Sequence, residues 1–237
     1  NRTNSLQISI KAQLQKMGVP VITTIHHPIT SDLRIALQSA DTWKLRLLIR
    51  RWYTFLNMQK KVVQQLDNLV TVSRASRQDI ATDFDIAETK LDIVHNGIDT
   101  GVFRPIPAIE REEFNVMVTA SADAPLKGLD YLIRAISILA GEIPALKLTV
   151  LGKLKEDGKT ANLISQLGLE NRIHFYSGLS SQGVAELYAK ATCAVVPSIY
   201  EGFGLPAGEA MACGVPVIST NGGALPEVVG DAGITVP

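Results

Sequence analysis

PSIYEGFGLPAGEAMACG, Pro197–Gly214, is the stretch that decides how the fold is interpreted. The apolar run Ala194–Val196 precedes it and is typical of a buried parallel strand. A glycine-punctuated loop then leads to Pro206, which suits a first helical turn because its missing N–H would have no intrahelical partner there. Gly214 follows the predicted helix 205–213 and is a residue that commonly ends helices. The stretch therefore predicts a strand, a tight loop and a helix that begins at the strand's carboxyl end.

The start of this predicted helix is a candidate anion-binding site. Backbone N–H groups near Gly204 and Leu205 would lack helical partners, and a helix N-terminus carries about half a positive charge. Glu209 lies roughly one turn into the helix, so a phosphate at the N-terminus would leave its carboxylate near an attached ribose. Glu201 precedes the helix and could accept hydrogen bonds from hydroxyls beyond the phosphate. Glycine-rich turns also serve packing alone, but two carboxylates flanking this turn favour a site for nucleoside, phosphate and polyol.

Composition describes an ordinary globular chain of 237 residues, with 46% hydrophobic and 19% charged residues. Lys and Arg together number 23, as do Asp and Glu, so net charge gives no case for a nucleic-acid partner. The two cysteines, Cys193 and Cys213, lie in apolar surroundings and favour a reducing compartment over a disulfide framework. No apolar run approaches the roughly 18 residues of a membrane span, and no signal peptide is recognised. We therefore expect a cytoplasmic protein.

Strands and helices alternate cleanly in the predicted second domain, 114–237. This alternation predicts a parallel sheet with right-handed crossovers. Its expected strands are Asn115–Ala120, Leu146–Leu151, Arg172–Phe175, Cys193–Val196, Val215–Ser219 and Ile234–Val236. Its expected helices are 129–140, 158–168, 180–190, 205–213 and 224–229.

The predicted first domain, 1–97, holds fewer elements, and a proline-containing charged stretch, 98–113, is the expected interdomain linker. Its expected strands are Val19–Ile25, Asn68–Val72 and Leu91–Val94, and its expected helices are 5–16, 41–66 and one capped by Ser73. Asp83-Phe84-Asp85 matches a D-x-D metal pattern, but we interpret it as a helix end.

The predicted helix 41–66 mixes aromatic side chains with basic ones. Such a helix can lie on an anionic membrane surface. The alternative is a core helix with a solvated basic face, which we favour by roughly two to one because amphipathic surface helices are common. Contact with the inner face of a membrane therefore stays open as a second interpretation.

Three further sets of residues follow predicted strands, where open α/β sheets bind ligands. His26 follows Val19–Ile25, and its position alone leaves open whether it orients a ligand or satisfies loop backbone. Lys127 follows the first strand of the second domain and can hold a diphosphate as a point charge, although most loop lysines are only solvated. Gly222 and Gly223 would allow close backbone approach to a ligand, or form a plain turn.

The spacing of Glu201 and Glu209 resembles the E-x(7)-E motif of the retaining glycosyltransferases of family 4. MACGVPVISTNGGALPEVV (211–229), FYSGLSSQGVAELYAKA (175–191), NGIDTGVFRP (96–105) and TIHHP (24–28) are also similar to that family. The resemblance implies an α/β fold of two Rossmann-like domains, the GT-B architecture. The first domain would be present only in its second half, and the second would be nearly complete, as in a fragment.

The resemblance also implies roles for single residues. His26, Glu201 and Lys127 would be catalytic. Nucleotide-sugar binding would involve Lys127, Ser121, Gly204, Leu205, Glu209, Gly222 and Gly223. Lys127 would contact donor phosphate and Glu209 the ribose. Ser121 stands where the family usually has an arginine, which leaves one phosphate charge without its usual partner.

The function implied is transfer of a sugar, with retention, from a nucleotide-diphosphate sugar to a sugar, lipid or small-molecule acceptor. This would be the work of a hexosyltransferase-type enzyme, without a cofactor or metal. Two alternatives remain. One is an enzyme like glycogen phosphorylase, which would need a pyridoxal-phosphate lysine. The other is a non-catalytic nucleotide-sugar or glycan-binding module, which the serine at position 121 keeps open.

Overall fold

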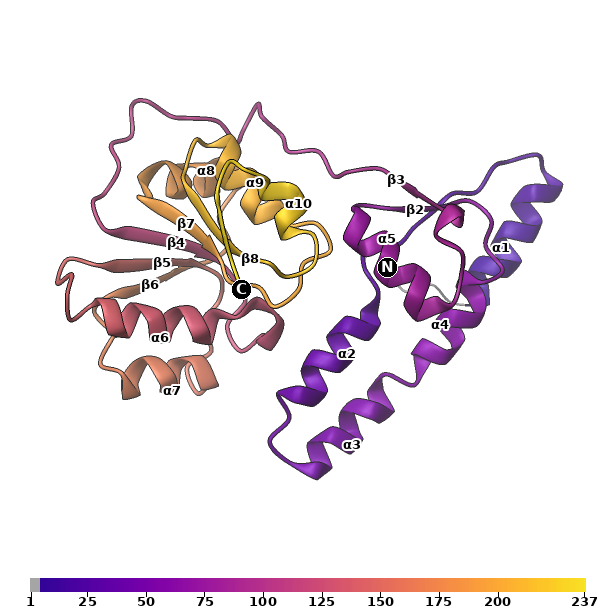
Figure 1. Cartoon of the computed structure of the whole chain (residues 1–237), viewed down its shortest axis with the longest axis horizontal. Coiled ribbons are helices and arrows are strands. Elements are labelled where there is room, and N and C mark those ends of the chain that lie inside the picture. The colour runs from indigo at the N-terminus through magenta and orange to yellow at the C-terminus, as the bar shows by residue number, and fades with distance from the viewer. Residues whose placement is uncertain (1–4) are drawn as a thin grey trace. The chain divides into compact units, whose positions relative to one another are not determined.

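The computed structural model describes residues 5–237, and the chain divides into two compact units, Asn1–Asn96 and Gly97–Pro237 (Figure 1). Each unit is an α/β fold with a parallel sheet, as predicted. Residues 98–113, the predicted linker, are grouped with the second unit, where Val102, Phe103 and Ile106 pack against the core. Within the described residues, no helix is long and apolar enough to cross a membrane.

The second unit is built on a sheet with the strand order β6-β5-β4-β7-β8-β9. Its strands are β4 (Asn115–Thr119), β5 (Lys147–Leu151), β6 (Ile173–Tyr176), β7 (Cys193–Val196), β8 (Val217–Thr220) and β9 (Ile234–Val236). Its helices are α6 (Leu129–Leu139), α7 (Lys159–Gln166), α8 (Ser181–Lys190), α9 (Leu205–Ala212) and α10 (Leu225–Val229). Every predicted strand and helix of this unit is present, with ends shifted by one or two residues.

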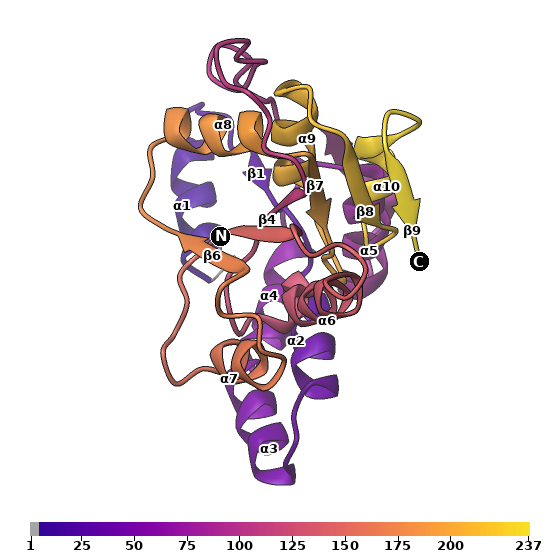
Figure 2. The ribbon, with the colours of Figure 1, turned by 90° about the vertical axis from the view of Figure 1, so that its left-hand side faces the viewer.

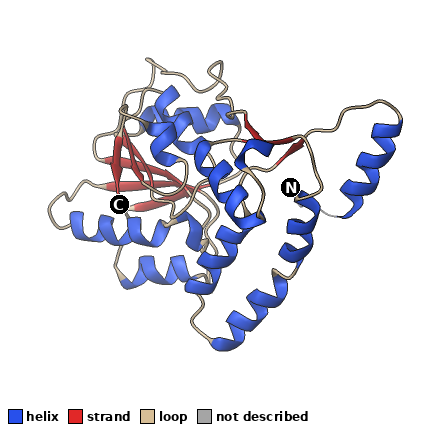
Figure 3. Cartoon of the chain, turned by 45° about the vertical axis from the view of Figure 1, so that its right-hand side comes forward, coloured by secondary structure: helices blue, strands red, loops and turns tan. Residues whose placement is uncertain are grey.

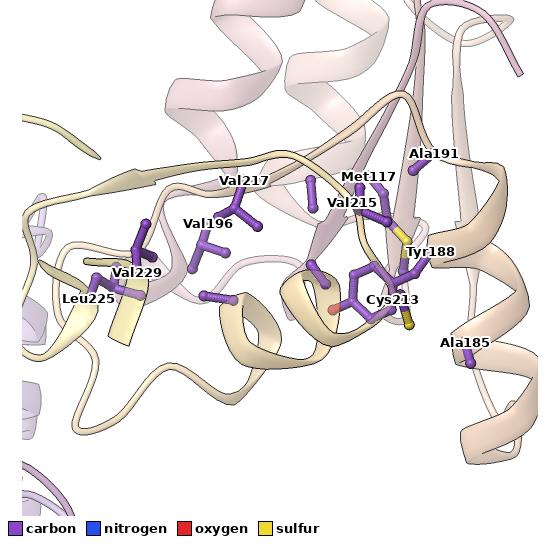
Figure 4. Close-up of a cluster of buried hydrophobic side chains, with 13 residues drawn as sticks. Met117, Ala185, Tyr188, Ala191, Val196, Cys213, Val215, Val217, Leu225 and Val229 are labelled. Atoms are coloured by element: carbon purple, nitrogen blue, oxygen red, sulfur yellow. The ribbon is translucent and has the colours of Figure 1, made fainter. Parts of the chain in front are cut away.

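Helices cover both faces of this sheet (Figures 1 and 3). One face packs under α6 and α7, where apolar residues of the sheet meet buried positions such as Ile133 and Ile164. The other packs under α8, α9 and α10, around Met117, Tyr188 and Leu225 (Figure 4). Burial on both faces explains the apolar runs of its inner strands β5 and β7.

The first unit has a smaller parallel sheet of order β1-β2-β3. Its strands are β1 (Thr23–Thr24), β2 (Leu69–Thr71) and β3 (Leu91–Ile93), and its helices are α1 (Ser5–Lys16), α2 (Ile29–Gln38), α3 (Trp43–Trp52), α4 (Phe55–Val63) and α5 (Arg74–Phe84). Ser73 caps α5 as predicted, because its hydroxyl accepts from the Ser76 N–H at 3.0 Å. The predicted strand Val19–Ile25 is reduced to β1, and α2 was not predicted.

The predicted single helix 41–66 is wrong, because the chain breaks between α3 and α4. The Thr54 hydroxyl donates to the Arg51 carbonyl at 3.0 Å, a bond that competes with helical pairing of the backbone. The break also separates two environments. α4 buries Gln59, Val62 and Val63, whereas no residue of α3, all of which is described, is buried. Figures 1 and 2 show α3 running back alongside α2.

Candidate active site

The strand order of the second unit places a topological switch point beside β4. The chain passes from β4 to β5 and β6 on one side and then returns to β7 on the other. The helices that follow β4 and β7, α6 and α9, cover opposite faces of the sheet, and such a switch point is where open α/β sheets bind ligands. The predicted residues Lys127 and Glu201 lie on the loops that follow β4 and β7.

The two loops are joined through backbone and glycine contacts. Ile199 N–H donates to the Leu126 carbonyl at 2.9 Å. Gly128 has φ +60°, and a Cβ there would lie 2.0 Å from the Pro197 carbonyl oxygen, so only glycine fits. The loop after β4 is thus packed directly on the loop after β7, which fixes the starting position of the Lys127 side chain.

A second contact holds the loop after β4 from its other end. Asp123 Oδ1 accepts from the backbone N–H of Thr160 at 2.8 Å and from its hydroxyl at 2.9 Å. In return the Thr160 hydroxyl lies 3.0 Å from the Asp123 N–H. Thr160 lies in the first turn of α7, so this exchange caps that helix and ties the loop to it. Sequence reasoning missed Asp123, since its partner lies 37 residues away.

The structure brings Lys127 and Glu201 into direct contact. Lys127 Nζ donates to Glu201 Oε1 at 2.6 Å, and the buried Ser198 donates its hydroxyl to the same oxygen at 2.8 Å. The Glu201 side chain is 13% exposed and that of Lys127 is 28% exposed. A cation and a carboxylate therefore lie at the switch point as a pair, although sequence reasoning had assigned them separate partners.

Gly222 and Gly223 lie against the backbone of the β7 loop. A Cβ at Gly222 would lie 2.6 Å from the carbonyl oxygens of both Ser198 and Ile199, and one at Gly223 would lie 2.3 Å from that of Glu201. The Ala224 N–H donates to the Glu201 carbonyl at 2.9 Å. These glycines therefore serve close packing of two loops, and that packing holds the backbone of Glu201.

Helix α9 begins beside the same loop. Gly204 is its N-cap with φ +99°, and the first intrahelical bonds run to Gly204 O from Ala207 and Gly208. The exposed Leu205 thus precedes the first bonded donor, and Pro206 has no N–H. The helix start is placed as the sequence predicted, and its role as an anion site stays a prediction.

Glu209 lies one turn further along α9, half-buried. Burial raises the pKa of the Glu209 carboxyl, and interaction with the nearby Tyr188 hydroxyl opposes that rise. The Tyr188 hydroxyl donates to the Pro206 carbonyl at 3.2 Å. Tyr188 is 1% exposed and reaches from α8 toward α9 near Cys213, and burial raises the pKa of its phenol (Figure 4). The carboxylate is therefore partly desolvated, which strengthens any hydrogen bond that it accepts.

The end of β5 approaches Ser121 and is followed by one cation that sequence reasoning did not consider, Lys153. Ser121 is exposed, and the position of a Cβ on Gly152 would be 3.8 Å from its Cα. Exposed Lys153 directly follows Gly152 at the carboxyl end of β5. A glycine followed by a lysine after a strand was the sequence signal that could have identified Lys153. Arg134, another candidate to replace the missing arginine, is exposed on α6 and lies away from the buried face that includes Ile133 and Ile136.

His26 belongs to the first unit, where it is exposed just after β1. Its carbonyl accepts from the Ser76 hydroxyl at 3.0 Å, which ties the strand end to the start of α5. Asp83 accepts from the Thr30 hydroxyl, and Asp85 ends α5 in the left-handed conformation with φ 54°. Among residues 5–237, no three His, Cys, Asp or Glu side chains are grouped to hold a metal ion.

Family models match both units. Residues 105–236 match the model described as Glycosyl transferases group 1, and residues 4–102 match Glycosyltransferase Family 4. The chain belongs to the glycosyl transferases group 1 family. It is similar to the MMP alpha-(1->4)-mannosyltransferase of Mycolicibacterium hassiacum, with 45% identity over 93% of this chain and 53% of that protein. The chain thus spans about half the length of the curated relatives it matches.

Solved structures of this family's fold confirm the GT-B architecture predicted from the sequence. Sucrose-phosphate synthase from Thermosynechococcus elongatus superposes with a TM-score of 0.73 at 23% identity, over 99% of this chain and 59% of that one. HepE from Anabaena, solved with UDP and glucose, superposes with a TM-score of 0.72 at 18% identity, over 97% and 61%. At these identities the likeness shows the fold, and the site residues stay predictions.

Proposed function

We propose that the second unit binds a nucleotide-diphosphate sugar and that the protein transfers the sugar, with retention, to an acceptor hydroxyl. The observation that carries this proposal is the Lys127–Glu201 pair beside the N-terminus of α9, at the switch point of the sheet. Family membership supports the reaction class, and retention rests on the E-x(7)-E resemblance alone.

Each proposed role follows from the chemistry of transfer. The leaving nucleotide diphosphate gains negative charge in the transition state, which a positioned cation and helix N–H groups stabilise. Lys127 and the start of α9 at Gly204 and Leu205 supply these groups. Glu209 accepts from the ribose hydroxyls and Glu201 from those of the donor sugar. Neither step calls for a cofactor or a metal.

Four further residues have supporting roles in this proposal. Gly222 and Gly223 pack against the loop that carries Glu201, and we propose that their backbone groups line the donor site. Ser121 offers one hydroxyl where a cation is usual, which leaves more of the phosphate charge to Lys127. His26 is proposed to be a catalytic residue, as the family resemblance implies.

Two named proteins narrow the donors to test. The relative from M. hassiacum is named as a mannosyltransferase, and the HepE structure was solved with UDP and glucose. We therefore propose thermal-shift screening with the UDP-, GDP- and ADP-sugars of glucose and mannose, followed by transfer assays with sugar, lipid and small-molecule acceptors. NMR of the new linkage tests retention, since the anomeric configuration must match the donor's. No shift with any of these donors would overturn the proposal.

The exposed serine at position 121 favours one second candidate, a binding module that holds the nucleotide sugar without transferring it. A module would bind the donor in the thermal-shift screen and show neither transfer nor donor hydrolysis. Slow hydrolysis of the bound donor, detected as release of the free sugar, would exclude a binding module.

We also propose that the first unit contacts an anionic membrane through α3 alone rather than through all of 41–66. Four large apolar side chains of α3 are more than 60% exposed, namely Trp43, Leu47, Leu48 and Trp52. Lys44 and Arg51 lie between them around the helix at 100° per residue, and α3 has no acidic residue. This mixture of aromatic and basic side chains suits a negatively charged lipid interface, as at the inner face of a cell membrane.

Vesicle co-sedimentation tests this membrane contact. We expect binding to phosphatidylcholine vesicles that contain about 30% phosphatidylglycerol, and weak binding without it. The double variant Trp43→Ser, Trp52→Ser should lose most of the binding. Tyr131→Ser, which removes an equally exposed aromatic ring from α6 of the second unit, is the matched control. No binding of the native protein to anionic vesicles would overturn the proposal, and concentration-dependent dimerisation through α3 would assign the surface to a second copy instead.

A further inference from the structure

The ion pair between Lys127 and Glu201 joins residues that lie 74 positions apart. Both donors to the pair's carboxylate reach one oxygen, since Lys127 Nζ lies 2.6 Å and Ser198 Oγ lies 2.8 Å from Glu201 Oε1. The carboxylate is mostly buried, at 13% exposed. In this structure the cation proposed to bind the diphosphate is therefore already compensated by a carboxylate.

Backbone contacts on both sides make this pair a built feature rather than a chance meeting of surface side chains. The Ile199–Leu126 hydrogen bond joins the loops that carry its two members. The Glu201 carbonyl is held by the Ala224 N–H, and Gly223 packs against it. The two backbones are therefore held relative to each other, and the Glu201 side chain is only 13% exposed, so the ion pair is stronger than one between fully exposed side chains.

A diphosphate that enters this site must share Lys127 with Glu201. Its negative charges would lie near the carboxylate, and like charges repel in a partly desolvated site. Ser198 alone then satisfies the carboxylate. A sugar attached to the diphosphate changes the balance, because its hydroxyls can donate to Glu201 in place of the Lys127 ammonium.

We propose that the Lys127–Glu201 pair exchanges partners when the donor binds, and that this exchange lets the site prefer an intact nucleotide-diphosphate sugar over the bare nucleotide diphosphate. Ser198 acts as the positioning residue that keeps the freed carboxylate aimed into the site. The consequence for turnover is weaker product inhibition. This inference rests on the proposed function of the second unit.

Glu201→Gln is the decisive variant, because it removes the charge and keeps the size and the acceptor oxygen. Calorimetry should compare GDP with GDP-mannose, UDP with UDP-glucose, and ADP with ADP-glucose. We expect the bare nucleotide to bind about three- to tenfold tighter to the variant, the range of a partly buried charge contact. The nucleotide sugar should gain less or lose affinity. Glu186→Gln, on the exposed face of α8, makes the same charge change away from the site and should alter neither affinity.

Ser198→Ala tests the positioning role. A general loss of structure would weaken the nucleotide and the nucleotide sugar equally. Removal of the hydrogen bond to Glu201 should instead weaken the nucleotide sugar about three- to tenfold and leave the bare nucleotide within about twofold. Thermal melting of each variant shows that it is folded before affinities are compared.

The outcomes separate the two proposals. If the native protein binds a nucleotide sugar and Glu201→Gln binds the bare nucleotide no tighter than native, the exchange is wrong and the donor site stands. If the native protein binds none of the six compounds, the proposed function fails and the exchange fails with it.

Discussion

The two units show how differently a strand end can be prepared for chemistry. In the second unit, the loops after β4, β7 and β8 bind each other through backbone groups, at Leu126 and Ile199 and at Glu201 and Ala224. In the first unit, β1 pairs with β2 over only two residues. His26, which follows β1, is exposed. The difference suggests that the precision of the proposed donor site comes from loop-on-loop packing that glycine permits, rather than from the strands themselves.

The largest expected effect tests that packing through two glycines with similar backbone angles. Gly128 has φ +60° and would place a Cβ 2.0 Å from the Pro197 carbonyl oxygen, whereas Gly18, with φ +73°, has nothing within 4 Å. Gly128→Ala should lower the free energy of unfolding by about 3 kcal/mol or more through strain and overlap, and Gly18→Ala by only about 1 kcal/mol. Denaturant unfolding measures both. Equal losses would mean that the packing of the two loops contributes nothing.

Next in size is the loss of the cation on the β4 loop. Lys127→Ala should reduce turnover at least 10²-fold, on the order of 2.7 kcal/mol, comparable with the removal of one preorganised oxyanion donor. Steady-state kinetics of Lys127→Ala, Lys153→Ala and Arg134→Ala compare it with the other candidate cations. We expect Arg134→Ala to be near native, since that side chain lies on the outer face of α6.

A Lys127→Ala enzyme within a few-fold of native would contradict the phosphate assignment. A severe Lys153→Ala would instead place the charge that the missing arginine usually carries at the end of β5. Strong non-additivity in the double variant Lys127→Ala, Lys153→Ala would then show that the two lysines act on one phosphate group.

Glu209 is expected to have an intermediate effect that depends on pH. Glu209→Ala should weaken nucleotide binding by roughly 1–3 kcal/mol, because buried hydroxyl partners are left unmatched. Burial raises the pKa of this carboxyl, so it takes up a proton at a higher pH than an exposed glutamate. Nucleotide affinity should therefore fall as pH drops from neutral through that raised pKa.

Calorimetry across this pH range separates Glu209 from the phosphate groups, which titrate nearby. The Glu209→Gln protein should keep only the phosphate-dependent part of the profile. If the nucleotide affinity of Glu209→Gln changes with pH in the same way as that of the native protein, Glu209 does not contact the ribose.

The smallest expected effect concerns stability in the first unit. Trp52→Ser, on α3, should change the free energy of unfolding by less than about 0.5 kcal/mol, since that side chain is 66% exposed. Phe84→Ala, at the end of α5, should reduce it by about 3–5 kcal/mol because that ring is buried. Thermal melting compares the two. A large loss from Trp52→Ser would mean that α3 packs on the protein and is not free to meet a membrane.

The sequence predicted the second unit almost completely, because its strands and helices alternate along the chain. It predicted the first unit less well. Val19–Ile25 has the composition of a strand, but only Thr23 and Thr24 form a ladder with β2. Residues 41–66 have a continuous helical pattern, yet a single hydroxyl contact at Thr54 accompanies a break that no periodicity reveals.

The candidate site was predictable as a set of residues and not as a set of contacts. The positions of Glu201 and Glu209 follow from their spacing, and Lys127 follows from its place after a strand. Their pairing does not, because 74 residues separate Lys127 from Glu201. Ser198 was passed over for a similar reason: a serine beside a proline gives no sign that its hydroxyl is buried against a carboxylate.

The central position of β4 also means that its two edges are paired at different times during synthesis. β5 follows β4 closely, but β7, which pairs with the other edge through Val116 and Cys193, leaves the ribosome only later. At about 5–20 residues per second, the roughly 80 intervening residues take about 4 to 16 s. For that time an apolar strand edge stays open to other nascent chains. Conditions that slow translation between β4 and β7 should therefore favour aggregation of this protein more than an equal delay after β8.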